Sequence, residues 1–445
     1  MRTEDNLQRR TPNAQLSTQR SIRDAFEKFV VPSYARFDIV LERGQGSHVW
    51  DADGRRYLDF GGGIAVCALG HANPEIADAL NQQSRKLVHV SNLYYIELQG
   101  LLAKRIVDLI APGCCFFCNS GAEANEGLFK LARKFGHDEG RYEIITTFDS
   151  FHGRTLAGIA ATGQEKVKKG FEPMVGGFKH VPFNDLEAVR RAITPQTAAI
   201  LVEPIQGESG ITIASPKYLL GLRRLCDERN LLLLFDEVQA GHFRTGKFQS
   251  WQTILDDVEA ASSHLHITEK RQDASSTFLP DGVSMAKSLG GGFPIGAFWV
   301  REKFAELLSA GTHASTFGGT PLGCAVALKI LDVIERDHLA ENARCMGDFL
   351  IGELEKLRQK YPRMLRAVRG FGLMIGIEFN PKAAVFAADE KSPAIQVVNR
   401  LHEKNLLTVP AASSVIRLLP ALTLSRTEAE EGLRVIDMVV EELNG

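Results

Sequence analysis

The fold is decided by residues 231–238, LLLLFDEV, in which five apolar residues precede two acids and a valine. Apolar runs of similar length occur at residues 142–148 (YEIITTF), 198–205 (AAILVEPI) and 295–300 (IGAFWV). An amphipathic helical pattern, residues 217–229, separates two of them. Strands that alternate with helices at this spacing predict an α/β fold with a largely parallel central sheet covered by helices.

The C-terminal third continues with a different order of elements. A long helical pattern begins at Pro321, and a strand pattern at residues 372–379 (GLMIGIEF) lies between two later helical patterns. We expect a large domain with the central sheet and a smaller α/β domain built from both ends of the chain. The predicted segments are 1–75 for the N-terminal part of the small domain, 76–325 for the large domain and 326–445 for the C-terminal part.

Composition excludes several function classes. The chain has 445 residues, 44% hydrophobic and 24% charged, with a formal net charge of −2. We therefore expect no nucleic-acid partner and no membrane partner, since there is no basic surplus and no apolar run long enough to span a bilayer. The polar first twenty residues lack the apolar core of a secretory signal, and scattered cysteines suit a reducing compartment. We expect a cytoplasmic protein.

Three features of the sequence point to one cofactor. Asp236 ends a predicted buried strand, where ligands bind in α/β sheets. Lys287 lies among small and apolar residues in GVSMAKSLGGGFP (282–294), a setting that lowers a lysine pKa. Ser120, Gly121 and Ala122 begin a helix, whose free N–H groups suit phosphate. Alone, each has an ordinary structural explanation, such as a strand edge or a plain serine cap. Together they are what pyridoxal phosphate requires: an amine, a carboxylate for the ring nitrogen and a phosphate site.

Longer motifs carry a resemblance to a known family. They are, in chain order, DFGGGIAVCALGH, FFCNSGAEANEGLFKLARKFG, SFHGRT, ILVEPIQGESG, LLLFDEVQAG, RTGKFQ, MAKSLGGGFPIGAF, STFGGTPLGCAVAL, GLMIGIEF and VIRLLPAL. The chain resembles the class III (subgroup II) aminotransferases of pyridoxal-phosphate fold type I, over nearly its whole length from about residue 31. The resemblance implies that fold and a pyridoxal 5'-phosphate cofactor.

The resemblance also implies roles for individual residues. Lys287 would be the Schiff-base lysine and proton carrier, and Asp236 would pair with the ring nitrogen. Thr316 would reach the phosphate from a partner subunit, which implies a homodimer with shared sites. The full set of implied cofactor contacts is Ser120, Gly121, Ala122, Phe151, His152, Glu203, Asp236, Val238, Gln239, Lys287 and Thr316.

Three further residues are implied as substrate contacts. Arg417 would bind the substrate α-carboxylate, Arg154 the other carboxylate, and Glu208 would screen Arg417 while the amino donor is bound. At Ile64, related ornithine δ-aminotransferases carry a tyrosine that helps to hold a free α-amine. We therefore expect an acylated donor, N-acetylornithine or succinylornithine, that exchanges its δ-amino group with 2-oxoglutarate by a ping-pong mechanism. Ornithine, GABA and other ω-amino acids remain alternatives.

Two stretches depart from the family pattern. Phe243 replaces a small residue and would either narrow the substrate channel or repack a loop. Residues 256–280, polar and poorly periodic, predict a surface loop longer than the family has there, either a plain insertion or a lid. We expect no metal site: Cys115 and Cys118 lack a second pair, and two histidines in that loop, His264 and His266, are too few.

Overall fold

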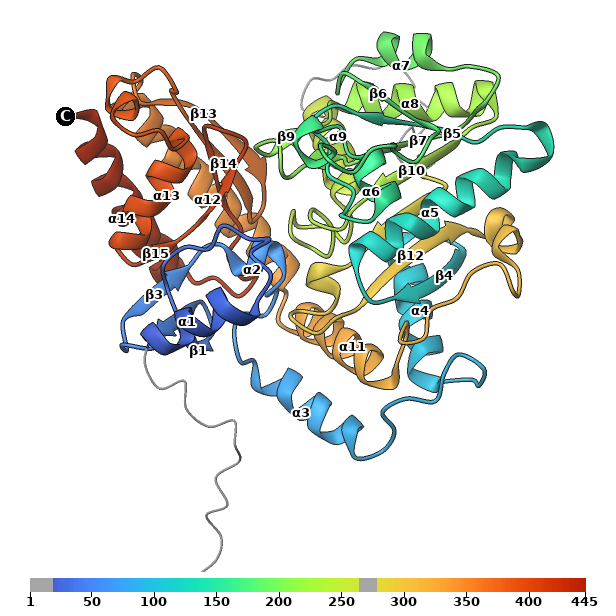
Figure 1. Cartoon of the computed structure of the whole chain (residues 1–445), viewed down its shortest axis with the longest axis horizontal. Coiled ribbons are helices and arrows are strands. Elements are labelled where there is room, and N and C mark those ends of the chain that lie inside the picture. The colour runs from blue at the N-terminus through green and yellow to red at the C-terminus, as the bar shows by residue number, and fades with distance from the viewer. Residues whose placement is uncertain (1–18, 264–277) are drawn as a thin grey trace, which may run out of the picture.

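The computed structural model describes residues 19–263 and 278–445, which form two lobes (Figure 1). The larger lobe is built on a seven-stranded sheet with order β4-β12-β11-β10-β7-β5-β6. Its strands in that order are β4 (Gly113–Cys118), β12 (Gly296–Arg301), β11 (Gly282–Met285), β10 (Leu232–Asp236), β7 (Thr197–Val202), β5 (Glu143–Thr147) and β6 (Phe178–Val181).

Strand β10, the core of the opening motif, lies at the centre of this sheet. All five of its residues are buried, and it pairs in parallel with β7 on one side and β11 on the other. Strands buried on both faces are continuous apolar runs, which is the pattern of LLLLFDEV. Only β12 breaks the parallel arrangement, because it runs antiparallel to both β11 and β4. The predicted mostly parallel sheet is confirmed.

Helices cover both faces of the sheet. On one face, α5 (Gly121–Gly136) buries Leu128, Leu131 and Ala132 against β5, β7, β10 and β12. On the other face lie α4 (Glu97–Ile110), which packs on β4, and α8 (Pro216–Arg229), which packs on β7 and β10. Shorter helices of this lobe are α6 (Leu156–Ala161) and α7 (Leu186–Ala192), and β8 (Ile205–Gln206) pairs with β9 (Thr212–Ile213).

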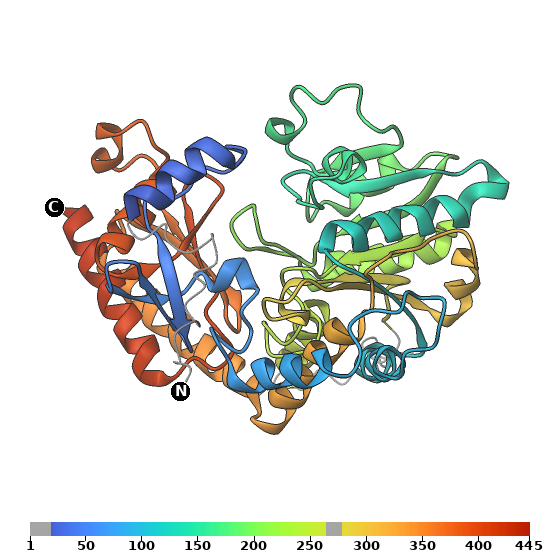
Figure 2. The same ribbon diagram turned by 60° about the horizontal axis from the view of Figure 1, so that its bottom comes forward.

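The smaller lobe brings both ends of the described chain together (Figures 1 and 2). Its first sheet has the order β1-β2-β3-β15, in which β15 (Leu406–Leu407) pairs in parallel with β3 (Arg56–Asp59). The N-terminal strands of this sheet are β1 (Leu41–Gln45) and β2 (His48–Asp51). Its second sheet is antiparallel, with the order β13 (Leu365–Phe371), β14 (Met374–Phe379), β17 (Val415–Leu418) and β16 (Val409–Ala411).

The helices α12 (Leu339–Lys360) and α13 (Pro393–Glu403) pack on these sheets, and α14 (Arg426–Asn444) packs on both of these helices. The helix α11 (Pro321–Arg336) packs against α4 in the larger lobe and against α12 in the smaller lobe. It also packs against α3 (Pro74–Ser84), as the lower part of Figure 1 shows. The predicted domain boundary at residue 325 falls inside α11, and the domain boundaries stay a prediction.

The predicted surface loop at 256–280 is wrong over its first part. The helix α9 (Ser250–Ser263) continues through residues 256–263, where alanine and glutamate are good helix formers despite the weak apolar periodicity. The helix starts where Glu237 accepts the N–H groups of Ser250 and Trp251, at 3.1 Å each. Residues 264–277, with His264 and His266, lie outside the described residues.

Two short helices complete the N-terminal part, α1 (Gln19–Phe29) and α2 (Gly62–Ala65). Across residues 19–263 and 278–445, no helix combines the length and the apolar character that crossing a membrane requires.

Candidate active site

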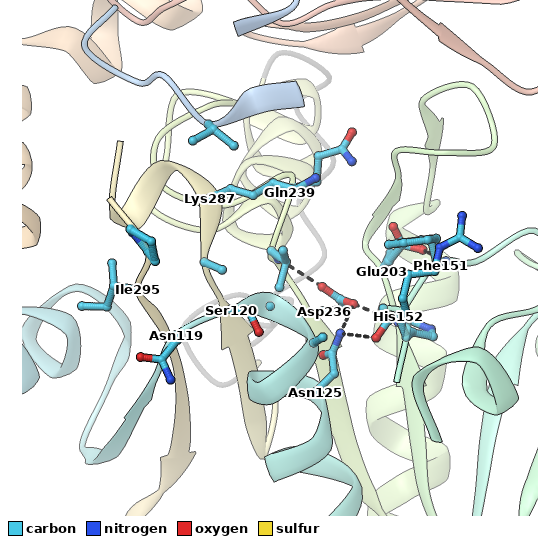
Figure 3. A pocket seen from close by; sticks show the side chains of 18 of the residues that line it. Asn119, Ser120, Asn125, Phe151, His152, Glu203, Asp236, Gln239, Lys287 and Ile295 are labelled. Carbon is cyan, nitrogen blue, oxygen red and sulfur yellow. Dashed lines mark hydrogen bonds and ion pairs between the residues drawn. The ribbon is translucent and has the colours of Figure 1, made fainter. Parts of the chain in front are cut away.

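A cavity of about 430 Å³ lies at the carboxyl ends of the central strands, where the sheet meets the start of α5 (Figure 3). Segments after five different strands, β4, β5, β7, β10 and β11, contribute to its wall, as expected for a ligand site in an α/β sheet. Its lining includes Asn119, Ser120, Gly121, Ala122, Asn125, Phe151, His152, Arg154, Glu203, Asp236, Val238, Gln239, Lys287 and Ile295. Most of the predicted site residues are therefore brought together.

Asp236 is held by three donors at the end of β10. Its Oδ2 accepts the Asn125 side-chain N–H at 2.7 Å and pairs with His152 Nδ1 at 2.9 Å. Its Oδ1 accepts the backbone N–H of Val238 at 3.1 Å. The residue is 5% exposed, so these donors stabilise a carboxylate that burial would otherwise disfavour. Figure 3 shows the Asn125 and His152 contacts converging on this one side chain.

The N-terminus of α5 faces the same cavity. Ser120 caps the helix because its side-chain oxygen accepts the N–H of Glu123 at 3.2 Å. The first N–H groups, those of Gly121 and Ala122, have no partner within a helix and lie in the cavity wall. A Cβ at Gly121 would lie 2.6 Å from the Val238 side chain, so only glycine lets the helix start pack this closely on Val238.

Lys287 follows β11, in the 3₁₀ turn η3 (Lys287–Leu289). It has a positive φ of 46°, which is a strained conformation for a side chain of this size and is common at functional sites. Burial lowers the pKa of the Lys287 amine to about 8, an effect opposed by the charge of Glu208. The neighbouring Ser288 donates to Ala65 O at 2.8 Å, which fixes the turn to the N-terminal part of the chain.

Phe151 and Glu203 line the cavity next to His152 (Figure 3). Glu203 Oε1 accepts the Phe151 N–H at 2.8 Å. Burial, together with the nearby charge of Asp236, raises the pKa of Glu203 well above its usual value. Arg154 is exposed, and its guanidinium lies 5.4 Å from the centre of the Phe151 ring. It is thus a free cationic group at the mouth of the cavity, without an acidic partner among the described residues.

A second cation, Arg417, lies on β17 of the smaller lobe and is 2% exposed. Its Nη1 donates to Glu208 Oε1 at 2.6 Å and to Gln239 Oε1 at 3.0 Å, and its Nη2 reaches Glu208 Oε2 at 3.3 Å. Burial favours the neutral form of Glu208, but Arg417 outweighs it and the pKa of Glu208 is lowered. Glu208 and Arg417 thus form a charged pair that connects the two lobes beside Gln239.

Some predicted residues lie elsewhere in this single chain. Thr316 is exposed and is not part of the cavity wall. Ile64 is 39% exposed with a φ of 62°, and Val66 of the same motif lines the cavity instead. Phe243 packs against Phe248 with ring centroids 5.4 Å apart, also away from this cavity, which favours a repacked loop over a narrowed channel.

Sequence reasoning missed Asn125 and Ser284. Asn125 lies in the motif GAEANEG, but only the fold brings its amide under Asp236. The signal that could have found it is spacing, because residue 125 lies one helical turn beyond Gly121 on the same face.

Comparisons with known proteins identify the family of this chain. The class-III aminotransferase family model matches residues 30–261 and 273–440. The chain is a class-III aminotransferase. The unmatched residues 262–272 fall within the predicted insertion.

Among curated relatives, acetylornithine aminotransferase of Gloeobacter violaceus is 44% identical over 95% of this chain and 98% of its own length. Among solved structures, ornithine aminotransferase of Toxoplasma gondii, described with partial occupancy of PLP at its active site, has a TM-score of 0.85. It is 29% identical, over 97% of this chain and 96% of its own. N-acetylornithine aminotransferase of Stenotrophomonas maltophilia has a TM-score of 0.74 at 33% identity, over 92% of this chain and 97% of its own.

The residues that line the cavity have the chemical groups that pyridoxal phosphate requires. It offers an amine whose pKa is lowered, a buried carboxylate and a helix N-terminus within one wall. In the part of the chain that the structure describes, no group of three or more His, Cys, Asp or Glu is arranged to hold a metal ion. Burial raises the pKa of both Cys115 and Cys118, which disfavours the thiolate that a metal or redox role requires.

Proposed function

We propose that this enzyme transfers the δ-amino group of N-acetylornithine to 2-oxoglutarate, forming glutamate, with pyridoxal 5'-phosphate as its cofactor. The observation that carries the proposal is the arrangement of Lys287 and Asp236 around one cavity, with the Glu208–Arg417 pair beside it. The 44% identity to an acetylornithine aminotransferase over nearly the whole chain supports the donor.

The cofactor, when bound, supplies an electron sink that stabilises negative charge at the carbon next to the transferred nitrogen. Asp236 would supply the carboxylate for the ring nitrogen, and the N–H groups of Gly121 and Ala122 would hold the phosphate. Val238 and Phe151 would lie on the two faces of the ring, and Gln239 and His152 would contact its edge. These residues lie in the segments that follow β4, β5 and β10 in the chain.

Lys287 carries the proton in this proposal. Its Nζ would accept a proton from the substrate carbon and hold it for return, and only the neutral amine can accept a proton. A pKa of about 8 leaves an appreciable neutral fraction near physiological pH, whereas an ordinary lysine has almost none.

The two arginines distinguish the two substrates. Glutamate presents two carboxylates, so Arg417 binds its α-carboxylate and Arg154 binds the other. N-acetylornithine enters with its amine first and has one carboxylate, which Arg154 binds. During that half-reaction Glu208 neutralises Arg417, so that a buried guanidinium is not left without a partner.

We also propose a homodimer and a cytoplasmic location. The exposed position of Thr316, outside the cavity of its own chain, agrees with a contact to the cofactor phosphate of a partner subunit. A shared site of this kind is incomplete in one chain.

The alternative donor is free ornithine or another ω-amino acid, which the 0.85 TM-score to an ornithine aminotransferase favours. The test measures kcat/KM for N-acetylornithine, succinylornithine, ornithine and GABA, each with 2-oxoglutarate. The proposal requires the acylated ornithines to be fastest. A higher kcat/KM for free ornithine would contradict it and support the alternative.

A further inference from the structure

Three buried side chains form a chain of hydrogen bonds beneath the cavity. Ser284 Oγ donates to Asn125 Oδ1 at 2.7 Å, and Asn125 Nδ2 donates to Asp236 Oδ2 at 2.7 Å. Ser284 is 0% exposed and Asn125 is 2% exposed. Water does not compete for these contacts, so each bond depends on the protein groups alone.

The topology of the fold produces this arrangement. Ser284 on β11 is the direct register partner of Asp236 on β10. Asn125 lies on α5, four residues after Gly121, and therefore on the face that carries the start of the helix. One helix thus contacts the cavity at two points, through its N-terminus and through Asn125 under Asp236 (Figure 3).

The hydrogen-bond pattern fixes the orientation of the Asn125 amide. Its nitrogen donates to Asp236 and to the His152 carbonyl at 3.2 Å, and its oxygen accepts from Ser284. A flipped amide would set its oxygen against the Asp236 carboxylate and the His152 carbonyl, which are both acceptors. The two acceptors therefore fix the orientation in which Asn125 donates to Asp236, and Ser284 stabilises that orientation by donating to the amide oxygen.

The charged groups around Asp236 make the hydrogen bond from the Asn125 amide important. His152 faces it from the loop after β5, Glu203 from the loop after β7, and Glu237 follows it in the chain. Lys287 faces it from the turn after β11. Two of these four groups are acids, which oppose a negative charge on Asp236, so a neutral donor that is permanently aligned favours the carboxylate.

We propose that Ser284 and Asn125 are positioning residues that hold Asp236 Oδ2 on the protein side, so that Oδ1 faces the ring nitrogen of the cofactor. The proposal rests on the proposed function, because it assumes that pyridoxal phosphate binds in this cavity. Neither residue touches the reacting atoms, and both act through Asp236.

Three variants test the proposal: Asn125→Asp, Ser284→Ala and the control Asn342→Asp. Asn342 lies on α12, where its amide donates to the carbonyls of Leu422 and Leu424, so its substitution also removes a structural donor. The dissociation constant of pyridoxal phosphate is measured by titrating each apo chain. The pH dependence of the visible absorbance of the lysine-bound cofactor is recorded in parallel.

Asn125→Asp is nearly isosteric and replaces the donor to Asp236 with an acceptor. We expect a dissociation constant raised about 100-fold, since a hydrogen bond to a charged group is lost and two acceptors are opposed. Ser284→Ala removes only the donor to the Asn125 amide oxygen, which leaves a buried acceptor without a partner, and we expect a rise of about 3-fold to 10-fold. In both variants the pH at which the visible band titrates shifts, whereas Asn342→Asp leaves both values within about 2-fold of the parent.

Two results would overturn the proposal. The first is that Asn125→Asp and Ser284→Ala leave the dissociation constant of pyridoxal phosphate and the titration of the visible band unchanged. The second is that Asn342→Asp changes both quantities as much as these two variants do. If Asn125→Asp fails to fold, Ser284→Ala against Asn342→Asp decides the question. A failure of the proposed cofactor differs, because the unsubstituted chain would then not bind pyridoxal phosphate, and a failure of the proposed donor appears only in the kcat/KM comparison of donors.

Discussion

Substituting Lys287 with methionine should make the cofactor-free enzyme more stable at neutral pH. The methionine keeps most of the apolar stem and removes the amine, whose charged form is disfavoured by burial. The pKa of Lys287 is lowered from its usual value of 10.5 to about 8. At about 1.4 kcal/mol per pH unit, the charged amine destabilises the folded state by up to about 3 kcal/mol.

The sign of the pH dependence follows from which state binds the proton. Below pH 8 the amine of Lys287 is protonated in both states, and the whole penalty is present. Between pH 8 and 10.5 the unfolded chain binds the proton while the folded chain has lost it, so the folded state gains stability as pH rises. Above 10.5 both states are neutral and the penalty is gone.

The assay is urea unfolding of both cofactor-free proteins at pH 7 and at pH 10. Other titrating groups are common to both proteins, so they cancel in the difference. We expect Lys287→Met to exceed the parent by up to about 3 kcal/mol at pH 7 and by much less at pH 10. A difference that is the same at both pH values would refute the lowered pKa and, with it, the neutral amine that the mechanism requires.

Two further predictions concern charged pairs. Glu208→Gln keeps a hydrogen bond to Arg417 but removes the negative charge, so the kcat/KM ratio of the N-acetylornithine half-reaction to the glutamate half-reaction should fall about 10-fold or more. Rapid-mixing measurement of each half-reaction checks this, and an equal change in both would count against the screening role. The second pair is His71 and Asp59, whose Nε2 and Oδ2 atoms lie 2.7 Å apart, and this hydrogen bond raises the pKa of His71 to about 10. The pair therefore stabilises the folded state fully below pH 6.5, and this stabilisation is lost as the pH rises through 10. His71→Gln should lower the free energy of unfolding by about 1.5–3 kcal/mol at pH 6 and by little at pH 10.5; a pH-independent loss would show that the pair is not ionic.

The sequence predicted the sheet well because buried parallel strands leave a strong local signal. The runs around Ile144, Leu201 and Leu234 are continuous and apolar, and the structure buries all three residues in neighbouring strands. The antiparallel direction of β12 could not be predicted in this way, because a buried strand has the same apolar sequence pattern in either direction. Nor could the helix through residues 256–263, whose apolar periodicity is weak.

Among the site residues too, some could be predicted from the sequence and others became evident only in the fold. The presence of Lys287 and Asp236 at one cavity could be predicted, because a lysine or an aspartate within an apolar stretch of sequence is easily recognised. Asn125 was not, because an asparagine in a helix carries no signal until the fold places Asp236 and Ser284 around it. The pairing of Glu208 with Arg417 spans 209 residues of sequence and came only from the family resemblance.

The most direct test of the central claim measures glutamate formed by the purified, cofactor-loaded enzyme from 2-oxoglutarate with either N-acetylornithine or free ornithine. The same measurement on Lys287→Ala is the control. We predict steady glutamate formation with N-acetylornithine, a kcat/KM lower by at least about 10-fold with ornithine, and loss of catalysis in Lys287→Ala. Equal or faster turnover of free ornithine would contradict the assigned donor. Undiminished turnover in Lys287→Ala would contradict the assigned site.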